Sequence, residues 1–182
     1  EVTSQNHTYL LNGSHLSVAG GLGFANGGSV LVHSYEGLTV FSNGAQIDAR
    51  GGRSGGNGGF VEVSGELLVF NGRVRLDGFG PAGRHGTLLI DPRDITIADN
   101  GTDDGFVNDG TIDFNEPDQV TDLTISDEAL EAIVGDILLQ ATRDIFVNHQ
   151  VDLVNGNNVQ LEAWRDIRFN AAINGANNLV IL

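Results

Sequence analysis

The chain has 182 residues, a net charge of −15, 26 glycines and no cysteine, and its 9 basic residues are all arginines. The lack of cysteine excludes a disulfide framework and a thiolate metal site, and the acidity without a basic patch argues against nucleic-acid binding. No apolar run approaches the ~18 residues of a membrane span, so we expect no membrane insertion.

Residues 1–97 contain short apolar segments that recur in the same order. The matches are residues 28–32 with 59–63 and 86–90, residues 38–41 with 67–70, and Ile47 and Asp48 with Leu76 and Asp77. Apolar and polar residues alternate within the copies, which predicts short strands with one face turned inward. Glycine and asparagine separate the copies, and both tolerate the backbone of tight turns.

Residues 98–134 interrupt this pattern. The segment is polar and acidic, and we interpret it as a loop insertion that ends in one short helix near residues 126–134. Ser126 is the expected N-cap, acidic residues fill the first turn, and Gly135 is the expected residue after the helix. The insertion is expected to cover a side or a seam of the fold.

Residues 135–182 repeat more closely. The matches are residues 141–145 with 163–167, residues 137–139 with 159–161, Asn148 with Asn170, and Val151 with Ile173, and residues 179–181 open a further copy. Units of this length cannot bury an apolar face alone and therefore stack. Because a leucine-rich pattern is missing, we predict an all-β fold, a right-handed parallel β-helix forming one continuous solenoid.

Three motifs carry a resemblance to a known family. They are GNGGFVEVSGELLVFNGRVRLDG (residues 56–78), GTLLIDPRDITI (86–97) and GDILLQATRDIFVNHQVDL (135–153). Together they resemble filamentous-haemagglutinin-like adhesins, which are exported by two-partner secretion. The resemblance implies a secreted or cell-surface bacterial exoprotein that passes through an outer-membrane transporter and folds outside the cell.

Because the family's secretion-domain motifs are not found, we expect this chain to be a segment that follows that domain. Both ends look cut, and end-to-end association with other copies is expected. The predicted function is structural and adhesive, not enzymatic: a rigid rod that contacts glycans, other cells or other copies of itself.

The acidic segment has two interpretations. One is a solvated, turn-rich loop. The other is a calcium site at Asp99, Asp103, Asp104 and Asp109, because closely spaced carboxylates supply the oxygen ligands that calcium takes. The spacing does not follow the EF-hand pattern. No cofactor other than calcium is predicted. One alternative function follows from this site: the chain is a calcium-stabilised scaffold without a ligand of its own.

The repeated Arg-Asp pairs have a structural and a functional interpretation. Arg143 and Arg165 head matching copies, so their charges are expected to form a ladder across neighbouring strands. Alternatively they bind a ligand, as arginines do in polysaccharide-active β-helix enzymes, and a lyase or hydrolase of this kind is the other alternative function. Trp164 either stacks on a sugar ring or packs against the loop or helix.

The remaining candidates favour structural roles. Phe41 and Phe70 align in the repeat and are expected to form an internal aromatic stack. The histidines His7, His15, His33 and His149 are dispersed and show no metal-ligand spacing. No nucleophile–base arrangement or phosphate-binding loop is present, so no catalytic residue is predicted.

Overall fold

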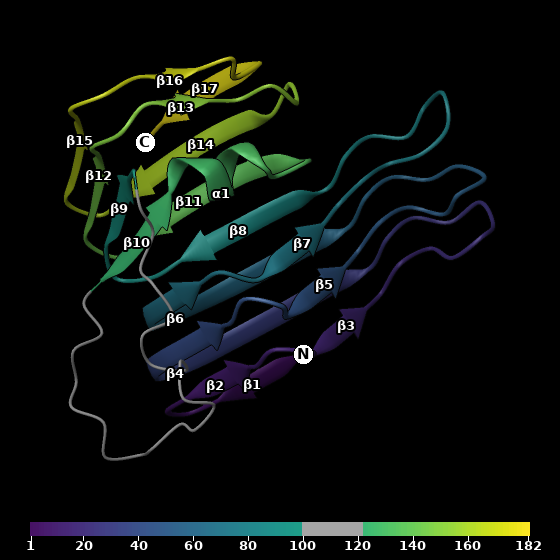
Figure 1. Cartoon of the computed structure of the whole chain (residues 1–182), viewed down its shortest axis with the longest axis horizontal. Helices are drawn as coiled ribbons and strands as arrows, with labels where there is room; N and C mark the ends of the chain where they lie inside the picture. Colours follow the sequence, from purple (N-terminus) through teal and green to yellow (C-terminus); the bar gives the residue numbers. More distant parts are fainter. Residues whose placement is uncertain (100–121) are drawn as a thin grey trace.

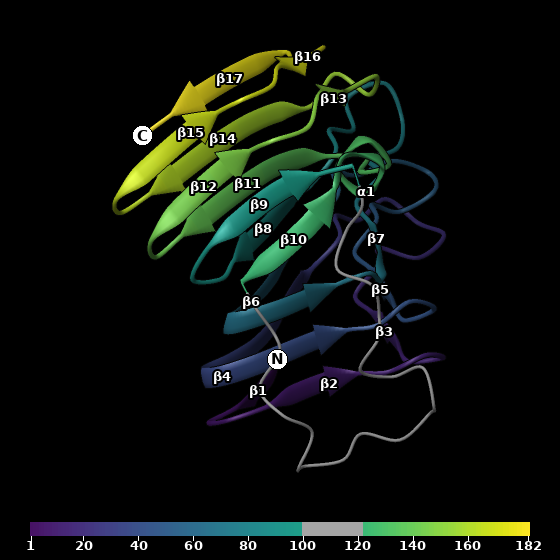
Figure 2. The same cartoon turned by 60° about the vertical axis from the view of Figure 1, so that its left-hand side comes forward.

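The computed structural model describes residues 1–99 and 122–182, and in these residues strands predominate and one short helix occurs. Every pairing between the named strands is parallel. Figures 1 and 2 show the strands stacked from the N-terminal (purple) to the C-terminal (yellow) end. The prediction of an all-β fold with parallel sheets is confirmed.

The largest sheet has eight strands. In hydrogen-bonded order they are β1 (Val2–Ser4), β4 (Ser29–Phe41), β6 (Phe60–Phe70), β8 (Thr87–Asp91), β11 (Asp136–Ala141), β14 (Asn158–Ala163) and β17 (Asn178–Ile181), and β2 (Thr8–Leu10) pairs with β4 off this path. The order along the sheet follows the order along the chain, so each strand lies against its successor in the repeat.

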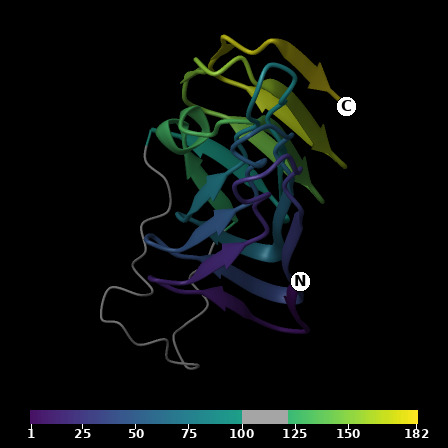
Figure 3. The same cartoon turned by 90° about the vertical axis from the view of Figure 1, so that its right-hand side faces the viewer.

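Between successive strands of this sheet, the chain forms strands of three smaller sheets. They comprise β3 (His15–Ser17), β5 (Gln46–Asp48) and β7 (Arg73–Arg75); β10 (Leu123–Ser126), β9 (Ile95–Ala98), β12 (Asp144–Val147) and β15 (Asp166–Phe169); and β13 (Val151–Asp152) with β16 (Ile173–Asn174). Figure 3 shows the same progression from the side, with the N-terminal strands at the bottom and the C-terminal strands at the top.

The register of the strands tests the predicted repeats. Val30 pairs with Val61, Phe41 with Phe70, and Ile137 with Val159, as the sequence matches require. Ala141 pairs with Ala163 and Val151 with Ile173, again as predicted.

One predicted match is wrong. Ile47 pairs with Val74, and Asp48 pairs with Arg75, so Leu76 and Asp77 lie beyond the paired residues. The sequence offered two apolar residues at alternating positions, Val74 and Leu76, and backbone hydrogen bonding selected the first.

The core consists of apolar rows that run across the strands. Val30, Val61, Leu88, Ile137 and Val159 form one such row, and each exposes no more than 5% of its surface. Burying an aliphatic side chain of this size stabilises a fold by roughly 1.5–3 kcal/mol. The row therefore ties five successive strands of the large sheet together.

A second group of buried side chains belongs to the four-stranded sheet and joins the same core: Ile95, Ile97, Leu123, Ile125, Ile145 and Val147. Phe41 and Phe70 are also buried, with ring centroids 5.4 Å apart and an interplanar angle of 67°. The predicted internal aromatic pair is therefore confirmed, in edge-to-face geometry.

Glycine is required where the loops after β3, β5 and β7 stack against one another (Figure 1, right). A Cβ on Gly58 would collide with the backbone of Leu76 and Gly86, and one on Gly27 would collide with the backbone of Ala49 and Gly59. The same backbones are joined by hydrogen bonds, Gly59 N to Ala49 O at 2.7 Å and Gly86 N to Leu76 O at 2.8 Å. The loops approach so closely that a side chain does not fit.

The predicted helix exists but is shorter than residues 126–134. Helix α1 spans Asp127–Glu131, and the Ser126 side chain accepts a hydrogen bond from Ala129 N, which confirms the N-cap. Ala132 is the C-cap of the helix, so Gly135 does not follow the helix directly. Strand β10, which precedes the helix and pairs with β9, was not predicted.

Within the described residues, no helix is long and apolar enough to cross a membrane. The division into residues 1–97, 98–134 and 135–182 stays a prediction, because much of its middle part lies outside the described residues.

Candidate functional site

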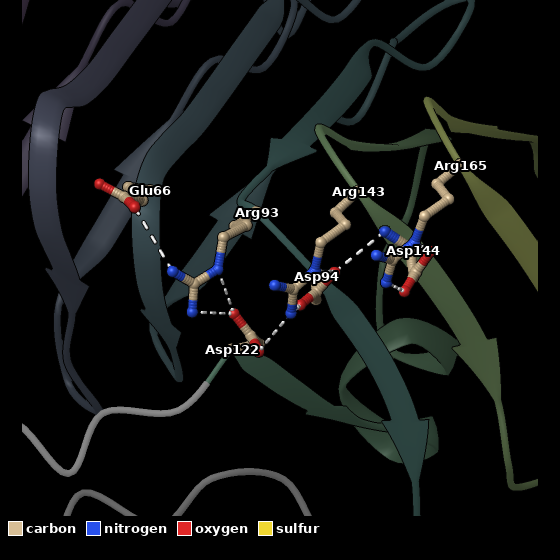
Figure 4. A network of polar contacts seen from close by, with 7 residues as sticks. All are labelled: Glu66, Arg93, Asp94, Asp122, Arg143, Asp144 and Arg165. Carbon is tan, nitrogen blue, oxygen red and sulfur yellow. Dashed lines mark hydrogen bonds and ion pairs between the residues drawn. The ribbon is translucent and has the colours of Figure 1, made fainter.

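A polar corner joins the eight-stranded sheet to the four-stranded sheet. Three copies of the sequence Arg-Asp-Ile form it, beginning at Arg93, Arg143 and Arg165. Each copy lies where a strand of the large sheet, β8, β11 or β14, gives way to a strand of the smaller one, β9, β12 or β15. Figure 4 shows the three arginines following one another along this corner. We call the group the arginine ladder.

Each rung of the arginine ladder joins two neighbouring copies. Arg143 donates from Nε to Asp94 Oδ1 at 2.8 Å, and its Nη2 pairs with the other oxygen of the same carboxylate. Arg165 holds Asp144 in the same two-point manner, with Nε to Oδ1 at 2.8 Å. Two-point pairing fixes the guanidinium plane as well as its position. Each arginine therefore neutralises the aspartate of the preceding copy.

The N-terminal end of the ladder makes further contacts. Arg93 pairs with Asp122 through Nη2 at 2.7 Å and with Glu66 through Nη1 at 3.4 Å. Asp122 also lies 3.3 Å from Arg143 Nη2, so it bridges two arginines. The ladder thus reaches from β6 to β15 (Figure 4).

Two carboxylates of the ladder, those of Asp94 and Asp144, are buried, and the guanidinium groups hold them ionised. Asp94 and Asp144 expose only 3% and 4% of their surface. Burial by itself would raise the pKa of Asp94, but hydrogen bonds from Arg143 and from the backbone of Asp144 lower it overall. The hydrogen bonds from Arg165 lower the pKa of Asp144.

This geometry bears on the two predicted interpretations of Arg143 and Arg165. Both guanidinium groups are occupied by buried aspartates, although their side chains remain 41% and 57% exposed. A ligand would have to compete with a carboxylate already bound at two points. The contacts favour the structural interpretation over ligand binding.

Trp164 lies in the turn before the last rung and is 90% exposed. This exposure argues against packing on the helix, whereas most of the loop lies outside the described residues. It lines an open groove of about 580 Å³, whose other walls are Asp91, Gln140, Ala141, Thr142, Glu162, Ala163 and Leu182. An exposed indole beside carboxylate and amide groups is a surface on which a sugar ring can stack and form hydrogen bonds.

Asp91 is the electrostatically unusual residue of this groove. Burial, followed by the negative charges of Glu62 and Glu162, raises the pKa of Asp91 to about 6. Its Oδ1 atom is buried and has no hydrogen-bond partner. Asp91 is therefore expected to change its charge in mildly acidic solution, and it retains an acceptor that no group of the described residues uses.

The predicted calcium residues divide into two sets. Asp103, Asp104 and Asp109 lie outside the described residues. Asp99 is described, with a side chain that is 72% exposed, and its Oδ1 atom lies 3.8 Å from His149 Nε2. The calcium site stays a prediction.

Sequence reasoning missed two features of the corner. It quoted the segment that contains Arg93, Asp94 and Ile95 but did not recognise it as a third Arg-Asp-Ile copy; comparison with the two later copies would have revealed it. It also missed Asp91, because the cause of its raised pKa is burial between neighbouring strands, which no local pattern records.

In comparisons with protein-family models, with curated proteins and with solved structures, nothing matches this chain. Its function is therefore inferred from its own residues and their geometry.

Proposed function

We propose that the chain is a stretch of right-handed parallel β-helix with a structural and adhesive function in a secreted bacterial surface protein. Parallel pairing between successive repeats supports this fold, because each repeat visits the large sheet and then a smaller one before it returns. Stacking of this kind makes a rod whose length grows with the number of repeats.

The rod is stiffened by two sets of interactions. Apolar rows such as that of Val61, Leu88 and Ile137 fill the interior, and the arginine ladder ties the corner outside them. Because both repeat with the strands, a local opening would break several of them together.

The single observation that carries the adhesive part of the proposal is the exposure of Trp164 beside the groove with Asp91 and Glu162. An indole that is 90% exposed offers a rigid apolar face to a partner. The proposed partner is a cell-surface glycan, whose apolar ring face stacks on Trp164 while its hydroxyl groups donate to the carboxylates.

Glycan-array binding of the whole chain tests this proposal, with calcium and with a chelator in parallel. We expect selective binding in the wild type and a loss of roughly tenfold in Trp164→Ala, if a sugar ring stacked on the indole contributes as much as the about 1–3 kcal/mol of a nucleic-acid base stacked on an aromatic side chain. Phe24→Ala is the matched control, because Phe24 is 86% exposed but lies in a different loop. Equal binding by the two variants would contradict a site at Trp164.

The second candidate function is a polysaccharide-active enzyme, and the raised pKa of Asp91 is the observation that favours it. Asp91 and Glu162 lie in one row, two strands apart. Ile90, next to Asp91, pairs with Leu139, and the next residue, Gln140, pairs with Glu162. Two strand steps place the backbones of Asp91 and Glu162 about 9.6 Å apart, just beyond the roughly 6.5–9.5 Å that separate the two carboxyl groups of inverting glycosidases. The test is the release of reducing ends from a polysaccharide. Release by the wild type that is lost in Asp91→Asn would favour the enzyme.

The calcium-stabilised scaffold remains a third candidate. Its expected signature is a melting temperature that rises with calcium in the absence of any glycan binding. Under the adhesin proposal the partners are glycans, other copies of the chain and the outer-membrane transporter that exports the parent protein.

A further inference from the structure

Three side chains able to bind a metal ion lie at the ends of three adjacent parallel strands. Asp127 follows β10, Asp99 follows β9, and His149 lies just after β12. In the sheet, Ser126 pairs with Ala98, and Ile97 pairs with Val147. Continuing this register past the strand ends brings the three residues into one row, although they are far apart along the chain.

The distances within this row suit a common ion. His149 Nδ1 lies 3.2 Å from Asp127 Oδ2, and His149 Nε2 lies 3.8 Å from Asp99 Oδ1. One ligand atom from each residue lies within 4.8 Å of the other two. Ligands that hold zinc at about 2.0–2.2 Å in tetrahedral geometry are about 3.4 Å apart. An imidazole binds one ion through only one of its two nitrogens, so the imidazole or one carboxylate has to rotate toward a shared point to complete the site.

An unsatisfied buried carboxylate points to a ligand here. Asp127 exposes 8% of its surface, and its Oδ1 atom has no hydrogen-bond partner among the described residues. His149 Nδ1 is also buried without a hydrogen bond, despite its proximity to Asp127. Burial of such groups without partners is costly. A bound cation would satisfy both of them.

We propose that Asp99, Asp127 and His149 bind a divalent transition-metal ion, for which zinc is the best match. Two carboxylates and a neutral imidazole are ligands that zinc accepts, and their charge of −2 balances that of the ion. Calcium prefers oxygen ligands only, so this site is chemically distinct from the predicted calcium site. The bound ion fastens the ends of β9, β10 and β12, and binding stabilises the folded chain.

The test is a thermal-unfolding titration of the whole chain, stripped with a chelator, against zinc chloride and separately against calcium chloride. We expect zinc to raise the melting temperature. Calcium at the same concentration should not produce this rise. Asp99→Asn and His149→Gln are expected to weaken zinc binding by more than about 10-fold, since even groups behind a ligand contribute that much. His15→Gln is the matched control, because His15 is exposed on β3.

Cobalt provides a second measurement that does not depend on stability. Cobalt(II) bound by these three residues is expected to give visible absorption bands that are lost in Asp99→Asn. Because the Asp99 side chain is 72% exposed, we expect this variant to fold. The proposal is overturned if zinc leaves the melting temperature unchanged. It is equally overturned if both variants retain wild-type zinc affinity, which would place any bound zinc elsewhere.

Discussion

At Asp91, burial together with Glu62 and Glu162 raises the pKa of the side chain to about 6, whereas an unfolded aspartate titrates near 3.9. Asp144 shows the opposite behaviour, since Arg165 lowers its pKa below the usual value. The two residues have the same side chain, but Asp91 ends β8 in the large sheet and Asp144 begins β12 in the four-stranded sheet. Their different chemistry arises from the presence or absence of a paired guanidinium.

These shifts predict opposite effects of removing the charge. A raised folded pKa means that ionised Asp91 opposes folding above pH 6. This cost shrinks as the pH falls below about 6 and is gone only below the unfolded pKa of about 3.9. Asp91→Asn should therefore raise the melting temperature at pH 7.5, by roughly 3 °C if solvent screening leaves on the order of 1 kcal/mol. At pH 4.5 the gain should shrink.

Asp144→Asn is the control for this prediction. Because the folded pKa of Asp144 is lowered, its contribution to stability persists down to about pH 4 and is lost only below that. The substitution should lower the melting temperature at both pH values. Thermal unfolding followed by circular dichroism measures both variants, and a pH-independent effect of Asp91→Asn would contradict the assigned shift.

At the scale of elements, the stacked loops after β3, β5 and β7 have little tolerance for side chains. Gly58 faces the backbone of Leu76 and Gly86, which cannot move without breaking the hydrogen bond between them. Gly23 lies in an equivalent glycine-rich loop, yet a Cβ there would meet open space. The same residue type therefore has different roles in neighbouring loops.

Gly58→Ala is expected to destabilise the chain by about 1–3 kcal/mol, as overpacking against immobile groups does. Gly23→Ala should be neutral or slightly stabilising, because alanine reduces the entropy of the unfolded chain. Urea unfolding of the two variants provides the measurement. Similar midpoints for Gly58→Ala and the wild type would show that the loops do not stack as described.

At the scale of the whole molecule, the outermost strand β17 leaves one edge of the large sheet open. Its residues Leu179, Val180 and Ile181 are 41–50% exposed, and a strand at a sheet edge has unpaired backbone groups. Parallel strands that already pair in register provide a template for another copy.

We therefore expect this 182-residue chain to associate through β17 as its concentration rises. Light scattering over a concentration series measures the effect, and Val180→Lys should reduce it because charged edge residues oppose pairing. A strict monomer at high concentration would count against the prediction.

The sequence by itself determined the strand repeats, most of their register, the helix N-cap at Ser126 and the Phe41–Phe70 pair, because each depends on local propensity or on a repeated apolar pattern. It did not determine the partner of Ile47, since two alternating apolar positions satisfied the same pattern.

Only the tertiary structure decided which charges meet. Asp94 lies far from Arg143 along the chain, as do Asp99 and Asp127 from His149, and parallel stacking brings each group together. It also placed Trp164 in solvent and buried Asp91 between strands. These outcomes depend on the position of one strand above another, a long-range property that residue order encodes only through the complete fold.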